Sequence, residues 1–245
     1  MPPPAAVPGG TVLALVGPAD DFAVLAERAA RHDATCPVRL VAADGVLAAF
    51  VPTPFDCLGM RAARLRISAG LDVVVEAVGL AALARVAGAD LQVPLALPAL
   101  RWTLPSPPRT GWSVAGTLTV ADLAARVAAD TEEFRHRAAA VPPGRNASAA
   151  VAAIAGELWA RPLAADHAAR LAHAASYLGF LPDHDAADPV GARPGGDGPV
   201  TLRTAGPWRR LDTPLGVTLA RASSSLGLLA GAGPGDSGEG PGRPA

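Results

Sequence analysis

The pattern of hydrophobic positions is clearest between residues 38 and 51, where two apolar runs are joined by Asp44 and Gly45. This pair predicts a β-hairpin with a type I′ turn, because that turn needs positive φ at both of its central residues. The turn also fixes the strand register, which pairs Ala43 with Val46, Val41 with Ala48 and Arg39 with Phe50. We expect this hairpin to lie at the centre of the fold.

The second face of the predicted hairpin is wholly apolar. It consists of Val38, Leu40, Ala42, Leu47, Ala49 and Val51. Either another part of the chain covers this face, or a partner does. Its large side chains form a candidate interaction face of Val38, Leu40, Leu47 and Val51.

Two further stretches, residues 61–67 and 71–77, alternate between apolar and charged residues. We expect them to form a second hairpin, with Arg64 or Arg66 opposite Asp72 or Glu76. Such alternation is typical of an antiparallel sheet with one face in water. With a strand at 11–16, a helix that begins near Asp20 and another over 79–86, the pattern predicts an antiparallel α+β domain over residues 11–97.

Residues 98–112 are rich in proline and hold Trp102, so we interpret them as a connector that ends at Trp112. Residues 113–229 are predicted to form a second, smaller domain. Its elements are a helix capped by Thr119 and Asp122, a helix capped by Asn146 or Ser148, a helix from Asp166 to Gly179, and strands at 200–204, 208–211 and 216–220. Helices followed by a β-hairpin resemble a winged helix. Residues 1–10 and the tail 230–245 are predicted to be disordered.

The composition excludes several enzyme classes. Half of the 245 residues are hydrophobic, and all 21 basic residues are arginine. A Walker-type phosphate loop, a pyridoxal Schiff base and a protein kinase each need a lysine, which this chain lacks. The chain also lacks a secretory leader and an apolar run long enough for a membrane span, so we predict a cytoplasmic protein with no membrane contact. Cys36 and Cys57 are expected to be a reduced, structural pair.

Motifs for catalysis, a metal or a cofactor are not found, and the sequence predicts none of the three. His167 and His173 lie six residues apart on the predicted third helix, about 120° from each other around its axis. The segment Asp183-His184-Asp185 is more consistent with a solvated loop than with a metal site. An enzyme without a short motif is the alternative, and it would need a cleft lined by residues such as His32, Asp33, Asp56 or His136.

The predicted C-terminal hairpin gathers arginines around one tryptophan. A nucleic-acid-binding surface would consist of Arg203, Trp208, Arg209, Arg210 and Arg221. The net charge of −1 provides no general attraction for nucleic acid, so any such contact would be local.

Two resemblances add to this picture. Residues 38–55, 156–182 and 206–221 resemble a family of uncharacterised actinobacterial proteins, and that resemblance implies no activity or site residue. The order of elements over residues 11–88 resembles one unit of a DNA sliding clamp, which implies a shape rather than a function. The sequence as a whole favours a non-enzymatic module that binds a protein partner or a second copy of itself.

Overall fold

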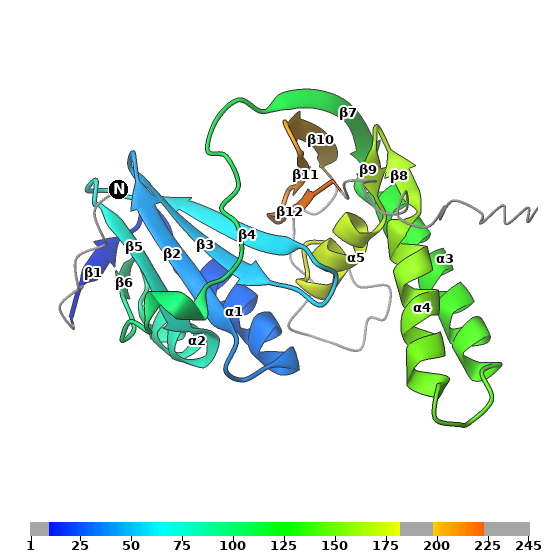
Figure 1. The fold of residues 1–245 in the computed structure, drawn as a ribbon. Helices are drawn as coiled ribbons and strands as arrows, with labels where there is room; N and C mark the ends of the chain where they lie inside the picture. The colour runs from blue at the N-terminus through cyan, green and yellow to red at the C-terminus, as the bar shows by residue number, and fades with distance from the viewer. Residues whose placement is uncertain (1–9, 182–197, 223–245) are drawn as a thin grey trace, which may run out of the picture.

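The computed structural model describes residues 10–181 and 198–222 (Figure 1). The first part of the chain contains β1 (Val12–Ala14), α1 (Asp20–His32), β2 (Pro37–Ala43), β3 (Val46–Pro52), β4 (Leu58–Arg64), β5 (Leu71–Glu76), α2 (Ala77–Val86) and β6 (Asp90–Gln92). The second part contains the 3₁₀ turn η1 (Ala99–Arg101), β7 (Ser113–Thr119), α3 (Val120–Ala139), α4 (Ala147–Ala160), β8 (Pro162–Ala164), β9 (His167–Ala168), α5 (Arg170–Tyr177), β10 (Pro199–Ala205), β11 (Trp208–Thr213) and β12 (Gly216–Arg221). The expected α+β class with a large antiparallel sheet is confirmed.

One antiparallel sheet of eight strands runs through both parts of the chain, in the order β5-β2-β3-β4-β12-β11-β10-β7. The two parts meet where β12 pairs with β4, with Val217 opposite Met60 and Leu219 opposite Leu58. The expected C-terminal hairpin is present, but it extends this sheet instead of forming a separate wing. The core is continuous across the junction, because inward side chains of both parts belong to one buried cluster.

The β2–β3 hairpin has the predicted turn and register. Asp44 and Gly45 have φ values of 51° and 73°, as a type I′ turn requires. Arg39 pairs with Phe50, Val41 with Ala48, and Ala43 with Val46.

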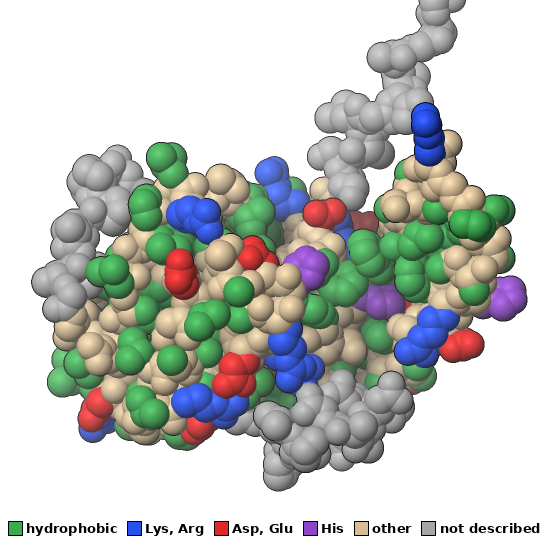
Figure 2. Space-filling model, turned by 90° about the horizontal axis from the view of Figure 1, so that it is seen from below, with side chains coloured by type: hydrophobic (Ala, Val, Ile, Leu, Met, Phe, Trp, Pro, Cys, Tyr) green, Lys and Arg blue, Asp and Glu red, His purple; other side chains and the backbone are tan. Residues whose placement is uncertain are grey.

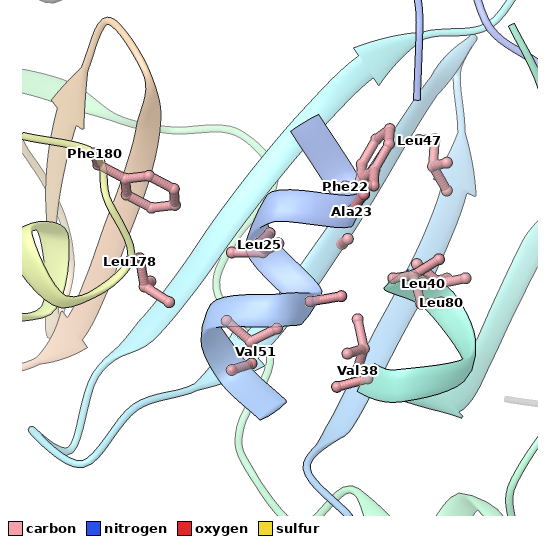
Figure 3. Close-up of a cluster of buried hydrophobic side chains, with 14 of the residues drawn as sticks. Phe22, Ala23, Leu25, Val38, Leu40, Leu47, Val51, Leu80, Leu178 and Phe180 are labelled. Carbon is pink, nitrogen blue, oxygen red and sulfur yellow. The ribbon is translucent and has the colours of Figure 1, made fainter. Parts of the chain in front are cut away.

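The prediction that this hairpin presents an exposed interaction face is wrong. Val38, Leu40, Leu47 and Val51 are each 0% exposed. Helix α1 lies over them, as the close-up of Phe22 and Leu25 in Figure 3 shows, and Leu80 of α2 packs beside Leu40. These side chains are therefore core, since the chain's own helices remove them from water.

The expected pairing of residues 61–67 with 71–77 is also wrong. β4 pairs with β3 and β12, whereas β5 pairs with β2 on the other side of the hairpin. Asp72 consequently forms its ion pair with Arg39 of β2, at 2.7 Å, and Arg66 forms one with Asp90. Neighbouring alternating segments need not form a hairpin when another strand offers a longer antiparallel partner.

The predicted cap at the start of α3 is present. The Thr119 hydroxyl accepts the backbone N–H of Asp122, and the Asp122 carboxylate accepts that of Thr119, which completes the capping box. The third predicted helix is shorter than expected, because its first residues form β9 and α5 begins at Arg170. His167 thus lies on a strand, and His173 lies on a helix.

The connector crosses the sheet face that points away from the helices (Figure 1). Arg39 donates to the Ser106 hydroxyl at 2.5 Å, and Arg109 forms an ion pair with Asp44. Beneath this connector, a second small core forms from Leu58, Trp208 and Leu219, with Phe50, Met60, Trp102, Trp112 and Val217 packed around it. We call the sheet face that carries this small core, opposite to the helices, the outer face of the sheet.

Candidate interaction edge

Strand β7 forms one end of the sheet. It pairs with β10 along one side, with Leu118 opposite Val200 and Thr117 opposite Thr201. Within the described residues, no strand pairs with its other side. The free side of β7 therefore presents backbone N–H and C=O groups that another strand could pair with.

The side chains of β7 anchor it to the chain on one face and leave the other open. Leu118 packs against the main core, and Gly116 lies opposite the buried Leu202. Thr117 is exposed, and Val114 is 60% exposed. The strand is thus fixed from the helix side, while its outer side chains remain in water.

The register of β7 shifts once, between Leu202 and Arg203 of β10, which leaves Ala115 as the extra residue of a β-bulge. Residues 116–119 pair regularly with 199–202. The β7 sequence, Ser-Val-Ala-Gly-Thr-Leu-Thr, contains no charged residue and no proline. Charged side chains, proline and β-bulges are features by which proteins protect an exposed edge from pairing. β7 has no charge and no proline, and its single bulge, at Ala115, lies before the regularly paired residues 116–119.

The opposite end of the sheet differs. Leu97, the residue just before the connector, covers part of the β5 edge, where it forms an isolated antiparallel bridge with Val74. Two acidic residues of β5, Asp72 and Glu76, add charge at that end. Of the two ends of the sheet, β7 is therefore the one suited to pairing.

A short hairpin of β8 and β9 supports the sheet behind β7. The Nε2 atom of His167 lies 3.1 Å and 3.2 Å from the carbonyl oxygens of Arg203 and Arg210. Arg209 donates to the Asp166 carboxylate at 2.5 Å, which lowers the pKa of Asp166. These contacts fix β9 to β10 and β11, next to the edge.

The residues predicted to bind nucleic acid are divided between the two faces. Arg203, Trp208, Arg210 and Arg221 lie on the outer face by strand register, whereas Arg209 points to the helix side and holds Asp166. Asp212 accepts from Arg203 at 2.8 Å and from Arg210 at 2.5 Å, and Arg210 also lies over the Trp112 ring. Trp208 is 8% exposed, so its ring packs within the protein. Most of this set therefore makes contacts within the chain.

Charges on the underside of the molecule are mixed. Figure 2 shows basic and acidic side chains lying close together over the helices. Arg85 pairs with Glu27 at 2.5 Å, and Arg137 pairs with Glu157 at 2.6 Å. This face offers no broad field of one sign.

A buried polar cluster lies between α3 and α5. Asp130 is 3% exposed, accepts from Arg126 at 2.9 Å and lies 3.3 Å from Nε2 of His173. Burial lowers the pKa of His173, and the neighbouring Asp130 opposes that shift. Asp130 of α3 and His173 of α5 thus form a buried polar contact between the two helices.

The residues considered for an enzyme, His32, Asp33, Asp56 and His136, are all exposed. The Asp33 carboxylate accepts hydrogen bonds from the backbone N–H and the hydroxyl of Thr35, and His136 lies on α3.

Both cysteines are free and buried, and burial raises the pKa of Cys36 to about 11 and that of Cys57 to about 12. No group of three His, Cys, Asp or Glu residues in the described part of the chain could hold a metal ion. The Asp183-His184-Asp185 segment lies outside the described residues.

Sequence reasoning did not predict β7. The signal was present in its Val, Thr and Leu residues just before the Thr119 cap, but the strand's partner, β10, lies far along the chain.

Comparison with protein families matches two domains of unknown function. Residues 10–103 match the domain DUF8010, and residues 107–225 match the domain DUF8185. No curated protein matches the chain.

Among solved structures, the chain shows a weak likeness to bacterial DNA sliding clamps. A DNA polymerase III subunit beta from Pseudomonas aeruginosa has 11% identity and a TM-score of 0.48, with 88% of this chain and 65% of that chain covered. A DnaN sliding clamp from Bartonella birtlesii bound to griselimycin has 11% identity and a TM-score of 0.45, with 86% and 65% covered. A Caulobacter crescentus pol III beta has 12% identity and a TM-score of 0.43, with 88% and 66% covered. The chain thus spans just under two thirds of the length of these proteins.

No helix in the described ranges, residues 10–181 and 198–222, has the length and apolar character needed to cross a bilayer.

Proposed function

We propose that this protein is a protein-interaction module that accepts an extended segment of a polypeptide as an additional strand beside β7. The observation that carries this proposal is the free side of β7, an exposed strand without charge or proline. The opposite end of the same sheet is closed by Leu97.

Strand addition uses the groups that β7 offers. Backbone N–H and C=O groups supply the hydrogen bonds, and side chains beside the edge supply selectivity. The free side needs no rearrangement to accept a strand, since β10, Leu118 and the α3 cap already hold β7 extended. A preformed edge lowers the entropic cost of association.

The test uses the full chain and a capped peptide of alternating threonine and valine. We expect the peptide to slow amide exchange in β7 and to leave exchange in β5 unchanged, with hydrogen exchange read by mass spectrometry. The matched control is the same peptide with alternate backbone nitrogens methylated, which removes donors without changing the side chains.

Protection of β7 by both peptides, or by neither, would overturn strand addition. Binding of duplex DNA that protects β10–β12 near Arg203, Arg210 and Arg221 would favour the nucleic-acid alternative instead.

A further inference from the structure

We infer that the strand taken up beside β7 is β7 of a second copy of this chain, running antiparallel, with Thr117 on the two-fold axis. This inference rests on the proposed function, because it names the partner of the same edge.

The register follows from the regular half of the strand. Antiparallel pairing about Thr117 places Thr117 opposite the partner's Thr117, Gly116 opposite the partner's Leu118, and Ala115 opposite the partner's Thr119. Side chains that oppose each other in an antiparallel pair share a face. Gly116 and Leu118 both lie on the helix side and Thr117 lies on the outer side, so the two copies agree in this register.

The opposed residues suit each other in size and chemistry. A leucine meets a glycine twice on the helix side, so no two large side chains of the paired β7 strands oppose each other there. On the outer side two threonine hydroxyls meet at the axis, which is a favourable cross-strand pair. Ala115, the bulge residue, meets a threonine and contributes only a methyl group.

Charge does not oppose self-pairing. β7 carries none, and the outward arginine nearest along β10, Arg203, lies opposite Val114 and already binds Asp212 at 2.8 Å. A foreign strand would need charges or pockets on β7 to select it, and the uncharged β7 offers no charge for selection. A second copy needs neither, because a two-fold axis presents the same complementary residues twice.

The contact is small. Stable protein–protein interfaces bury about 1,200–2,000 Å², and one strand pair buries less than that. We therefore expect a dimer that forms reversibly and increases with protein concentration.

The experiment is disulfide trapping with Thr117→Cys in the full chain. Cα atoms directly opposed in an antiparallel pair lie about 4.5–5.5 Å apart, within the range that a disulfide spans. The native Cys36 and Cys57 do not compete, because both are buried thiols with raised pKa values.

Two variants serve as matched controls. Ala115→Cys lies on the same strand, but the two copies of this residue would be about 13 Å apart along the strands. Thr201→Cys lies on the same face, one strand inward from Thr117. Under mild oxidation we expect Thr117→Cys to give a covalent dimer at least tenfold more abundant than either control.

The outcomes separate the two proposals. Equal trapping of all three variants would show random collision and overturn the inference. If Thr117→Cys stays monomeric while the threonine–valine peptide protects β7, strand addition stands and self-pairing falls. If neither occurs, both proposals fall.

Discussion

The backbone N–H of Leu97 donates to the carbonyl oxygen of Val74 across 2.7 Å. This bond uses a main-chain acceptor of β5 that an incoming strand would otherwise pair with. The sheet therefore has one closed end and one free end. A sheet with two open ends could add copies without limit, whereas one open end allows association to stop at a pair.

Replacing Leu97 by proline removes the N–H that makes this bond. We expect Leu97→Pro to expose the β5 end, so that sedimentation velocity at rising concentration shows species larger than a dimer. Ala96→Pro, at the exposed position just before Leu97, keeps the N–H of the Leu97–Val74 bond and serves as the control. A size distribution for Leu97→Pro identical to that of the unaltered chain would contradict the protective role of the Leu97–Val74 bond.

Short sequence motifs predicted the elements that depend on residues close together in the sequence. Asp44-Gly45 predicted the turn and the register of β2–β3, and Thr119 with Asp122 predicted the start of α3. Strand neighbours that are distant in sequence could not be found in this way. β4 pairs with β12 and β2 with β5, and no short motif encodes either choice.

The burial of the hairpin face that contains Leu47 leads to a prediction about stability. Leu47 is fully buried beneath α1, so Leu47→Ala leaves a cavity and should lower the free energy of unfolding by about 2–5 kcal/mol. Its neighbour Val46 points to the outer face and is 39% exposed. Val46→Ala should cost well under half as much in the same urea titration. Equal losses in the two variants would contradict the burial of this face.

The residues predicted to bind nucleic acid illustrate the same limit of local sequence signals. Sequence reasoning located the arginines of the C-terminal hairpin but not their acceptors. Asp212 binds both Arg203 and Arg210. Asp166 binds Arg209, and helix α5 lies between these two residues in the sequence. Three of the four arginines predicted to bind nucleic acid thus form ion pairs within the fold.

Gly216 allows β12 to begin directly against the Phe180 ring. A Cβ atom there would lie 2.6 Å from two ring carbons, and Phe180 is 1% exposed and has little room to move. We expect Gly216→Ala to lower the free energy of unfolding by about 1–3 kcal/mol through overpacking. Gly70→Ala is the control, since a Cβ at Gly70 meets no atom within 4 Å. A loss for Gly216→Ala no larger than for Gly70→Ala, measured by thermal melting, would contradict this contact.

The buried cluster of His173 and Asp130 predicts how stability depends on pH. Burial lowers the pKa of His173 below its ordinary 6.5, and the hydrogen bond that its imidazole donates to the Asp130 carboxylate only partly offsets this. Arg126 binds the same carboxylate, Arg161 lies 3.7 Å from its other oxygen, and the Phe55 ring stacks on the imidazole. The lowered pKa means that folding favours the neutral form of His173.

The unfolded chain binds a proton at this histidine more readily than the folded chain does. The contribution of His173 is thus complete above about pH 6.5 and is lost as the pH falls through the lower, folded pKa. We expect the free energy of unfolding to fall over this range, by at most about 1.4 kcal/mol per pH unit for one proton. His173→Gln keeps a donor for Asp130 but does not titrate, so its unfolding free energy should change less with pH in matched urea titrations. His136→Gln, at an exposed position on α3, should keep the pH dependence of the unaltered chain. If His173→Gln and the unaltered chain show the same slope between about pH 7 and pH 5, titration of this buried histidine is not the cause.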